Sequence, residues 1–206
     1  MIDKIYVFDD VIDLDYQNKI KNKLLGEEKF PWYYIDDISG DDPERQKRGG
    51  FTHGYVNEYG IESDYHYLFI DLIKKSCSKI KIKEVNAILG RSFFQLPTNI
   101  KKEDVDTPHT DIPVEHFVML YYVCDSDGDT IIYNEKCKNY KNFDNNYDVV
   151  DKTKFTIQKK VSPKQGRVVL FNGALYHTAE QPNHNLRCIV NYDLIDLDRT
   201  HSGVRI

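Results

Sequence analysis

The sequence predicts a mainly β fold with supporting α-helices, arranged as an antiparallel double-sheet sandwich or jelly roll. Helical periodicity is confined to the first 80 residues, and short apolar segments separated by turn residues follow from about residue 84. Hydrophobic residues make up 40% of the chain and aromatic residues 13%, which is enough for a sizeable core. We expect one domain over residues 1–206, with N-terminal helical support over 1–80 and a β core over 84–196.

Two N-terminal segments have the apolar spacing of amphipathic helices. Residues 10–25 form the first, which Asp13 or Asp15 can cap and which Gly26 ends. Residues 64–80 form the second. Ile5–Phe8 is a short strand candidate, and residues 39–50 read as a polar loop.

The remaining predicted elements are strands, of which Phe117–Cys124 is the most apolar. The others are Val85–Leu96, Thr130–Tyr133, Phe155–Val161, Arg167–Phe171 and Leu186–Ile195. Residues 134–154 are polar with interspersed aromatic residues, so we expect a long loop that acts as a lid; a plain surface insertion is the alternative.

Charge and cysteine usage narrow the classes of function. The net charge of -5 argues against a nucleic-acid-binding protein, and Lys79, Lys81 and Lys83 fit the solvated face of a strand better than a DNA site. No segment has the length and apolarity of a signal peptide or membrane span. The four cysteines are scattered, as expected for reduced thiols in a cytoplasmic protein.

His109, Asp111 and His177 are the strongest candidates for a metal site. Residues two apart on a strand share a face, so His109 and Asp111 can offer a nitrogen and an oxygen to one ion, and His177 supplies a third ligand. Two histidines and a carboxylate leave open positions on an iron ion for reactants. Arg187 lies in an apolar strand, where a charge needs an anionic partner. The alternative is that this common spacing arises by chance.

Several segments resemble the prolyl-hydroxylase-like branch of the iron(II)/2-oxoglutarate-dependent dioxygenases. They are Thr107–Asp111, Leu120–Val123, Asp127–Thr130, Leu170–Gly173 and Tyr176–Thr178, together with Arg187. The opening of the chain, with Phe8–Asp10 and Phe30–Tyr33, is similar to small phage-encoded members. The resemblance covers nearly the whole chain and implies a double-stranded β-helix, a jelly-roll or cupin-like fold.

The resemblance also implies roles for individual residues. His109, Asp111 and His177 would bind Fe(II), and Arg187 would hold the distal carboxylate of the co-substrate 2-oxoglutarate. Tyr122 is expected to join Arg187, in preference to Tyr121, which should face away; a purely core role for Tyr122 is the alternative. Ascorbate is a candidate reductant. No catalytic residue is expected beyond the metal ligands.

The activity that the resemblance implies is hydroxylation of a small molecule or of a peptide residue, such as a prolyl residue. Rival functions are a cupin-like metal enzyme that does not use 2-oxoglutarate, and a non-catalytic binding module.

Other polar residues are weaker candidates for the site. His116 could lie at the substrate mouth, and Arg91 and Gln95 could line the cavity wall; structural roles are the alternative for each. His53, His66, His184 and His201 are expected to be surface or structural residues.

Overall fold

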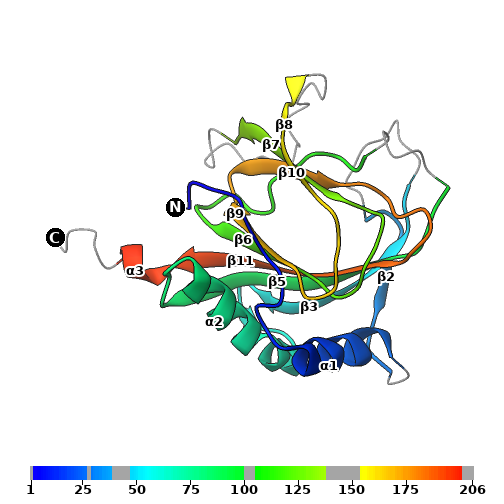
Figure 1. The fold of residues 1–206 in the computed structure, drawn as a ribbon, viewed down its shortest axis with the longest axis horizontal. Coiled ribbons are helices and arrows are strands. Elements are labelled where there is room, and N and C mark those ends of the chain that lie inside the picture. Colours follow the sequence, from blue (N-terminus) through cyan, green and yellow to red (C-terminus); the bar gives the residue numbers. More distant parts are fainter. Residues whose placement is uncertain (1, 27–28, 39–46, 100–104, 138–153, 201–206) are drawn as a thin grey trace.

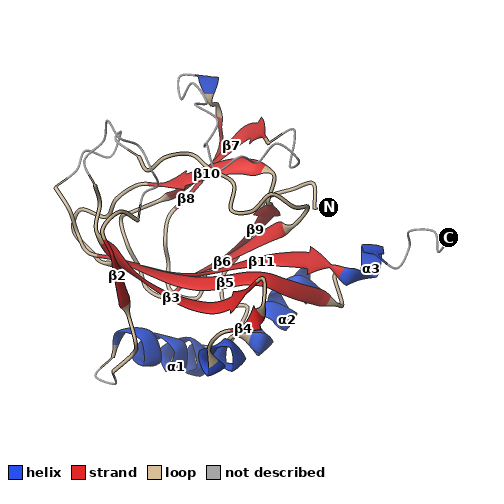
Figure 2. Ribbon diagram, turned by 180° about the vertical axis from the view of Figure 1, so that it is seen from behind, coloured by secondary structure: helices blue, strands red, loops and turns tan. Residues whose placement is uncertain are grey.

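The protein is described here by a computed structural model, which covers residues 2–26, 29–38, 47–99, 105–137 and 154–200. Two antiparallel sheets lie opposite each other, and the helices cover the outer face of the larger one (Figure 1). Figure 2 shows the same arrangement from behind, with α1 and α2 beneath the strands. The mainly β fold expected from the sequence is confirmed. Among the described residues, no helix is long and apolar enough to cross a membrane.

The larger sheet contains eight strands and the smaller sheet three. In spatial order the larger one has β1 (Tyr6–Phe8), β9 (Val168–Asn172), β6 (Phe117–Tyr122), β11 (Arg187–Asp196), β5 (Val85–Gln95), β3 (Gly50–Asn57) and β2 (Tyr33–Ile35), with β4 (Gly60–Ile61) paired to β3. The smaller one has β10 (Leu175–Ala179), β7 (Thr130–Lys136) and β8 (Ile157–Val161).

Helix α1 (Leu14–Leu25) ends where the sequence predicts and begins after Asp13, one of the two predicted caps, four residues later than the predicted segment. The Asp13 carboxylate accepts a hydrogen bond from the Tyr16 amide at 2.9 Å, and Gly26 ends the helix by donating to the Asn22 carbonyl. The second predicted helix is divided at Phe69 into a 3-10 turn, η1 (Asp64–Leu68), and α2 (Ile70–Lys79). A short α3 (Leu197–Thr200) follows the last strand.

Alternating side chains of the central strands fill two separate cores. On one face of the larger sheet, Met119, Tyr121 and Val190 pack with apolar residues of the helices. On the other face, Leu120, Tyr122 and Ile189 pack with residues of the smaller sheet, such as Ile132, Val161 and Leu175. Tyr121 and Tyr122 therefore point to opposite faces, as strand alternation requires.

Two parts of the sequence interpretation need correction. Strands β2 and β3 were not predicted, because Gly50, Gly54 and His53 hide the strand pattern; pairing with β5, such as Phe51 opposite Phe94, fixes β3 in the sheet. The first 80 residues thus supply strands as well as helices. The loop and lid expected over residues 134–154 need a later start, since β7 continues to Lys136. Most of this segment, residues 138–153, lies outside the described residues, so the lid stays a prediction.

An ion-pair cluster fixes the edge strand β1. Asp9 accepts hydrogen bonds from Arg167 Nε at 2.7 Å and Nη2 at 3.1 Å, and from Lys164 Nζ at 3.0 Å. The hydrogen bond from Arg167 lowers the pKa of Asp9 from 3.8 to about 2. Because this pKa is lower in the folded protein, the pairs stabilise it above about pH 4, and the stabilisation is lost as the pH falls toward 2.

We therefore expect Asp9→Asn to lower the free energy of unfolding by about 0.5–1 kcal/mol at pH 7, the range of partly exposed ion pairs. The difference from the parent should vanish near pH 2. Urea unfolding at several pH values measures both effects. Asp36→Asn, which removes an exposed pair with Lys47, is the matched control and should change little. A loss that persists unchanged at pH 2 would contradict the electrostatic explanation.

Candidate metal centre

A backbone bridge brings the two candidate histidine ligands side by side. The His109 amide donates to the His177 carbonyl at 3.0 Å, and the His177 amide donates to the His109 carbonyl at 2.9 Å. His177 belongs to β10, but His109 is in an isolated bridge rather than the regular strand that its spacing suggested. Pro108 has no amide hydrogen to extend the pairing. The two imidazole rings lie 4.6 Å apart between centroids.

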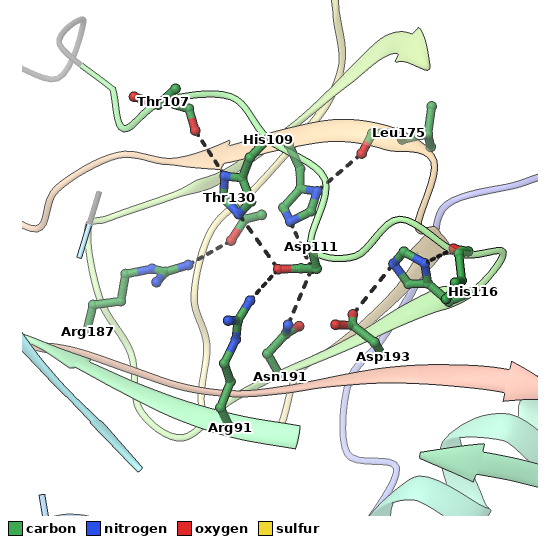
Figure 3. Close-up of polar contacts among 12 residues, drawn as sticks. Arg91, Thr107, His109, Asp111, His116, Thr130, Leu175, Arg187, Asn191 and Asp193 are labelled. Carbon is green, nitrogen blue, oxygen red and sulfur yellow. Dashed lines mark hydrogen bonds and ion pairs between the residues drawn. The ribbon is translucent and has the colours of Figure 1, made fainter. Parts of the chain in front are cut away.

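Asp111 completes the group of three ligands. Its Oδ1 lies 3.8 Å from His109 Nε2, and its Oδ2 lies 3.4 Å from His177 Nε2 (Figure 3). These separations exceed those of good hydrogen bonds, about 2.7–3.2 Å. They match two ligands that are each about 2.1 Å from one ion, which are then roughly 3.0–4.2 Å apart. The three side chains are therefore spaced to surround a metal ion.

Both histidines are held in the tautomer that a metal ligand needs. His109 Nδ1 contacts the Thr107 carbonyl at 3.0 Å, and His177 Nδ1 contacts the Leu175 carbonyl at 3.2 Å. A carbonyl oxygen only accepts, so each Nδ1 must carry the hydrogen and donate. This leaves the Nε2 lone pair free on each ring, the usual arrangement of histidines bound to metals. The donor set thus fits a divalent ion such as iron.

Burial and neighbouring charges keep two of the candidate ligands, His109 and Asp111, deprotonated. Burial would raise the pKa of Asp111, but His177, Arg91 and His109 hold that pKa well below its ordinary value. Arg91 Nη2 donates to Asp111 Oδ1 at 2.6 Å, and Asn191 Nδ2 lies 3.4 Å from Oδ2. Burial and the adjacent His177 lower the pKa of His109 to about 4. Metal binding requires these unprotonated forms.

Arg187 lies inside the barrel, and its hydrogen-bond partners among the described residues are all neutral. Its guanidinium donates to the Gly128 carbonyl at 3.0 Å, to Gln95 Oε1 at 2.9 Å and to Thr130 Oγ1 at 3.0 Å. The side chain is only 4% exposed, and within the described ranges no carboxylate pairs with it. The comparably buried Arg48, in contrast, pairs with Asp106 at 2.6 Å. A buried cation without an anionic partner is costly, so an anion next to Arg187 would stabilise it.

Tyr122 shares a hydrogen-bond acceptor with Arg187. Its hydroxyl donates to Thr130 Oγ1 at 2.8 Å, the same atom that accepts from Arg187 Nη2. Burial raises the pKa of Tyr122 to about 12, so the hydroxyl stays a neutral donor. The expected pairing of Tyr122 with Arg187 thus has a geometric basis, although the side chain is also part of the inner core.

One strand, β11, connects Arg187 to the three candidate metal ligands. Arg187, Ile189, Asn191 and Asp193 alternate along β11, so they share the inner face of the sheet. Arg187 and Asn191 are four residues apart, or about 13 Å along the strand. Because Asn191 contacts Asp111, Arg187 and the candidate ligands lie on the same inner face of the larger sheet, and Figure 3 shows Arg187 to one side of the ligands.

Sequence reasoning placed some of the surrounding residues wrongly or missed them. His116 is not at a mouth but 2% exposed beside Asp193, because its ring fills the space beside Gly173. Arg91 and Gln95 contact Asp111 and Arg187 respectively. Asn191 and Asp193 were not identified, although alternation from Arg187 along β11 would have placed both on the inner face.

Two further histidines have structural partners, as expected. Both ring nitrogens of His53 are hydrogen-bonded, to the Pro31 carbonyl and to Ser63 Oγ. His66 Nδ1 contacts the Tyr192 hydroxyl at 3.0 Å. His184 is exposed, and His201 lies outside the described residues.

The fold is that of the 2-oxoglutarate–iron(II) oxygenases, a double-stranded β-helix. A 2OG-Fe(II) oxygenase family oxidoreductase from Burkholderia pseudomallei aligns over 92% of this chain and 84% of its own, with a TM-score of 0.64 and 11% identity. The α-ketoglutarate-dependent epimerase of nogalamycin biosynthesis covers 93% of this chain and 78% of its own, with a TM-score of 0.59 and 11% identity.

A prolyl hydroxylase from Trichoplax adhaerens, solved with a peptide fragment of hypoxia inducible factor, covers 98% of this chain and 87% of its own. Its TM-score is 0.57 at 11% identity. No protein-family model matches the sequence, and no curated protein sequence matches it. The similarity is therefore one of fold, and assignment of the chemistry depends on the site itself.

Proposed function

We propose that this protein is an iron(II)- and 2-oxoglutarate-dependent oxygenase. The observation that carries the proposal is Arg187, a buried guanidinium whose partners among the described residues are all neutral, on the same inner sheet face as Asn191, which contacts the candidate ligand Asp111. A dicarboxylate can place one end on the metal and the other on the guanidinium, and its charge removes the cost of the buried cation.

In this proposal His109, Asp111 and His177 would hold the iron. Together with 2-oxoglutarate and dioxygen, the iron would supply the oxidising power for a C–H bond, and the co-substrate would be converted to succinate and carbon dioxide. One oxygen atom of dioxygen enters succinate and the other enters the hydroxylated product, so atoms and electrons balance.

The chain's own residues would bind and orient the co-substrate and would exclude water from the site. Arg187 would grip the distal carboxylate with its planar fork, and Tyr122 and Thr130 would present hydroxyl groups to the same end. Arg91 and Asn191 keep Asp111 in place. The inner core around Val118, Leu120 and Ile189 leaves little room for water, which strengthens these polar contacts.

Hydroxylation of a prolyl or other peptide residue is our preferred reaction, by analogy with the peptide-bound prolyl hydroxylase of the same fold. The epimerase of the same fold illustrates that this architecture also serves other oxidative outcomes on small molecules. A cupin-like enzyme that does not use 2-oxoglutarate, or a binding module, would leave the unpaired Arg187 without a purpose, so we do not favour either.

The proposal predicts that the purified protein consumes 2-oxoglutarate and forms succinate in equal amounts. Turnover should require both iron(II) and dioxygen, should proceed slowly without substrate and should accelerate when the true substrate is present. Mass spectrometry of succinate, with ascorbate as reductant, measures it. The matched control is His177→Ala, which should show none. Metal-loaded protein that neither binds nor consumes 2-oxoglutarate would contradict the proposal.

A further inference from the structure

A second group of three ligand atoms lies immediately beside the first. Atoms of Asp111, His116 and Asp193 all lie within 4.8 Å of one another. Asp193 and His116 are 0% and 2% exposed, and neither oxygen of Asp193 nor His116 Nε2 has a hydrogen-bond partner. An unsatisfied buried polar atom costs about 1–3 kcal/mol, and more if charged. Either a proton shared with the neighbouring Asp111 or a bound cation must therefore satisfy these atoms.

His116 is oriented like the two histidines of the first site. Its Nδ1 donates to the Val114 carbonyl at 2.7 Å, two residues earlier in the chain. His109 and His177 make the same contact with the carbonyls two residues before them, Thr107 and Leu175. All three rings therefore present an Nε2 lone pair toward the surroundings of Asp111. In this tautomer His116 Nε2 cannot donate to Asp193.

The spacing of these acceptors favours a metal ion over a shared proton. His116 Nε2 and Asp193 Oδ1 are 3.7 Å apart, farther than a hydrogen bond of about 2.7–3.2 Å allows. The separation lies between the 3.4 Å and 3.8 Å found between ligands of the first site. A proton shared between Asp193 and Asp111 would satisfy one oxygen of Asp193 but would leave its other oxygen and His116 Nε2 without a partner, whereas one cation can coordinate several acceptors at once.

The backbone makes room for the His116 ring. A Cβ at Gly173 would lie 2.1 Å from His116 Nε2, so any other residue there would displace the imidazole. The Gly173 amide also donates to the His116 carbonyl at 3.0 Å. Figure 3 shows the ring directed at Asp193, whose strand also carries Asn191 next to Asp111.

We propose that Asp111, His116 and Asp193 bind a second divalent cation, so that Asp111 is shared by two ions. Two carboxylates and one imidazole suit a first-row divalent ion such as manganese(II) or iron(II). Ions that share a carboxylate in this way are usually about 3.5–4 Å apart, close enough for their electron spins to couple. The cation would satisfy the orphaned oxygens of Asp193 and give Asp111 a second fixed partner besides Arg91.

Manganese(II) alone is the probe that tests this site. Equilibrium dialysis of the native protein should give two manganese ions per chain, and electron paramagnetic resonance should show a spin-coupled pair. Asp193→Asn keeps the shape of the side chain but removes its charge, so it should bind one ion and give an uncoupled six-line signal. His116→Gln, at the other end of the site, should do the same.

The controls separate the proposed second cation site from the proposed oxygenase activity. Thermal unfolding by circular dichroism checks that both variants are folded, and either folded variant suffices for the test. The measurement needs no 2-oxoglutarate, so it stands even if no succinate is formed. One ion per chain in the native protein would overturn the proposal. Two ions without spin coupling, or two ions retained by a folded Asp193→Asn protein, would overturn it as well.

Discussion

Replacing Arg187 with methionine is expected to weaken 2-oxoglutarate binding roughly tenfold to a thousandfold. Charge-assisted hydrogen bonds contribute about 1.5–3 kcal/mol each, and about 1.4 kcal/mol corresponds to a factor of ten. Methionine keeps much of the apolar stem but removes the fork that bonds Gly128, Gln95 and Thr130. Calorimetric titration of 2-oxoglutarate into oxygen-free, metal-loaded protein measures the change.

Two companion variants make the Arg187 result specific. Arg187→Lys should lose less, since the charge remains while the bidentate geometry goes. Arg167→Met removes an arginine that pairs with Asp9 on the surface, and it should leave 2-oxoglutarate binding unchanged. Metal content should stay at the parent value in all three. If the Arg187→Met protein binds the keto acid as tightly as its parent, Arg187 has only a structural role.

Loss of one metal ligand should have the second large effect. We expect His177→Ala to weaken iron(II) binding more than about 100-fold, because changes to residues that only support a ligand already reach 10–100-fold. Oxygen-free dialysis against iron(II), followed by metal analysis, measures it. His184→Ala, which removes an exposed histidine, is the matched control and should retain its metal. Equal iron affinity in the two variants would exclude His177 as a ligand.

The sequence predicts best those features that depend on local chemistry. Helix α1 follows from its apolar spacing, its Asp13 cap and its terminating Gly26, which all act within a few residues. The apolar strand β6 and the opposite faces of Tyr121 and Tyr122 follow from alternation. The three candidate metal ligands were singled out by ligand chemistry and same-face spacing together with the resemblance to a known family, because the spacing by itself is common.

Features that depend on distant pairing were missed. Strand β3 is fixed by β5, about 40 residues later in the chain. The role of Arg91 arises only because β5 and β11 pair, which places it opposite Asn191 and next to Asp111. The buried position of His116 depends on the space left by Gly173, and no local pattern reveals that space.

The central claim is that one cavity binds a metal through His109, Asp111 and His177 and a dicarboxylate through Arg187. Its most direct test is a crystal structure with manganese(II) and 2-oxoglutarate, in which anomalous scattering locates the metal. We predict an ion about 2.0–2.2 Å from the three ligand atoms. One carboxylate of 2-oxoglutarate should contact that ion and the other should contact the Arg187 guanidinium. A metal bound elsewhere only, or a 2-oxoglutarate that leaves Arg187 without an anionic partner, would contradict the account.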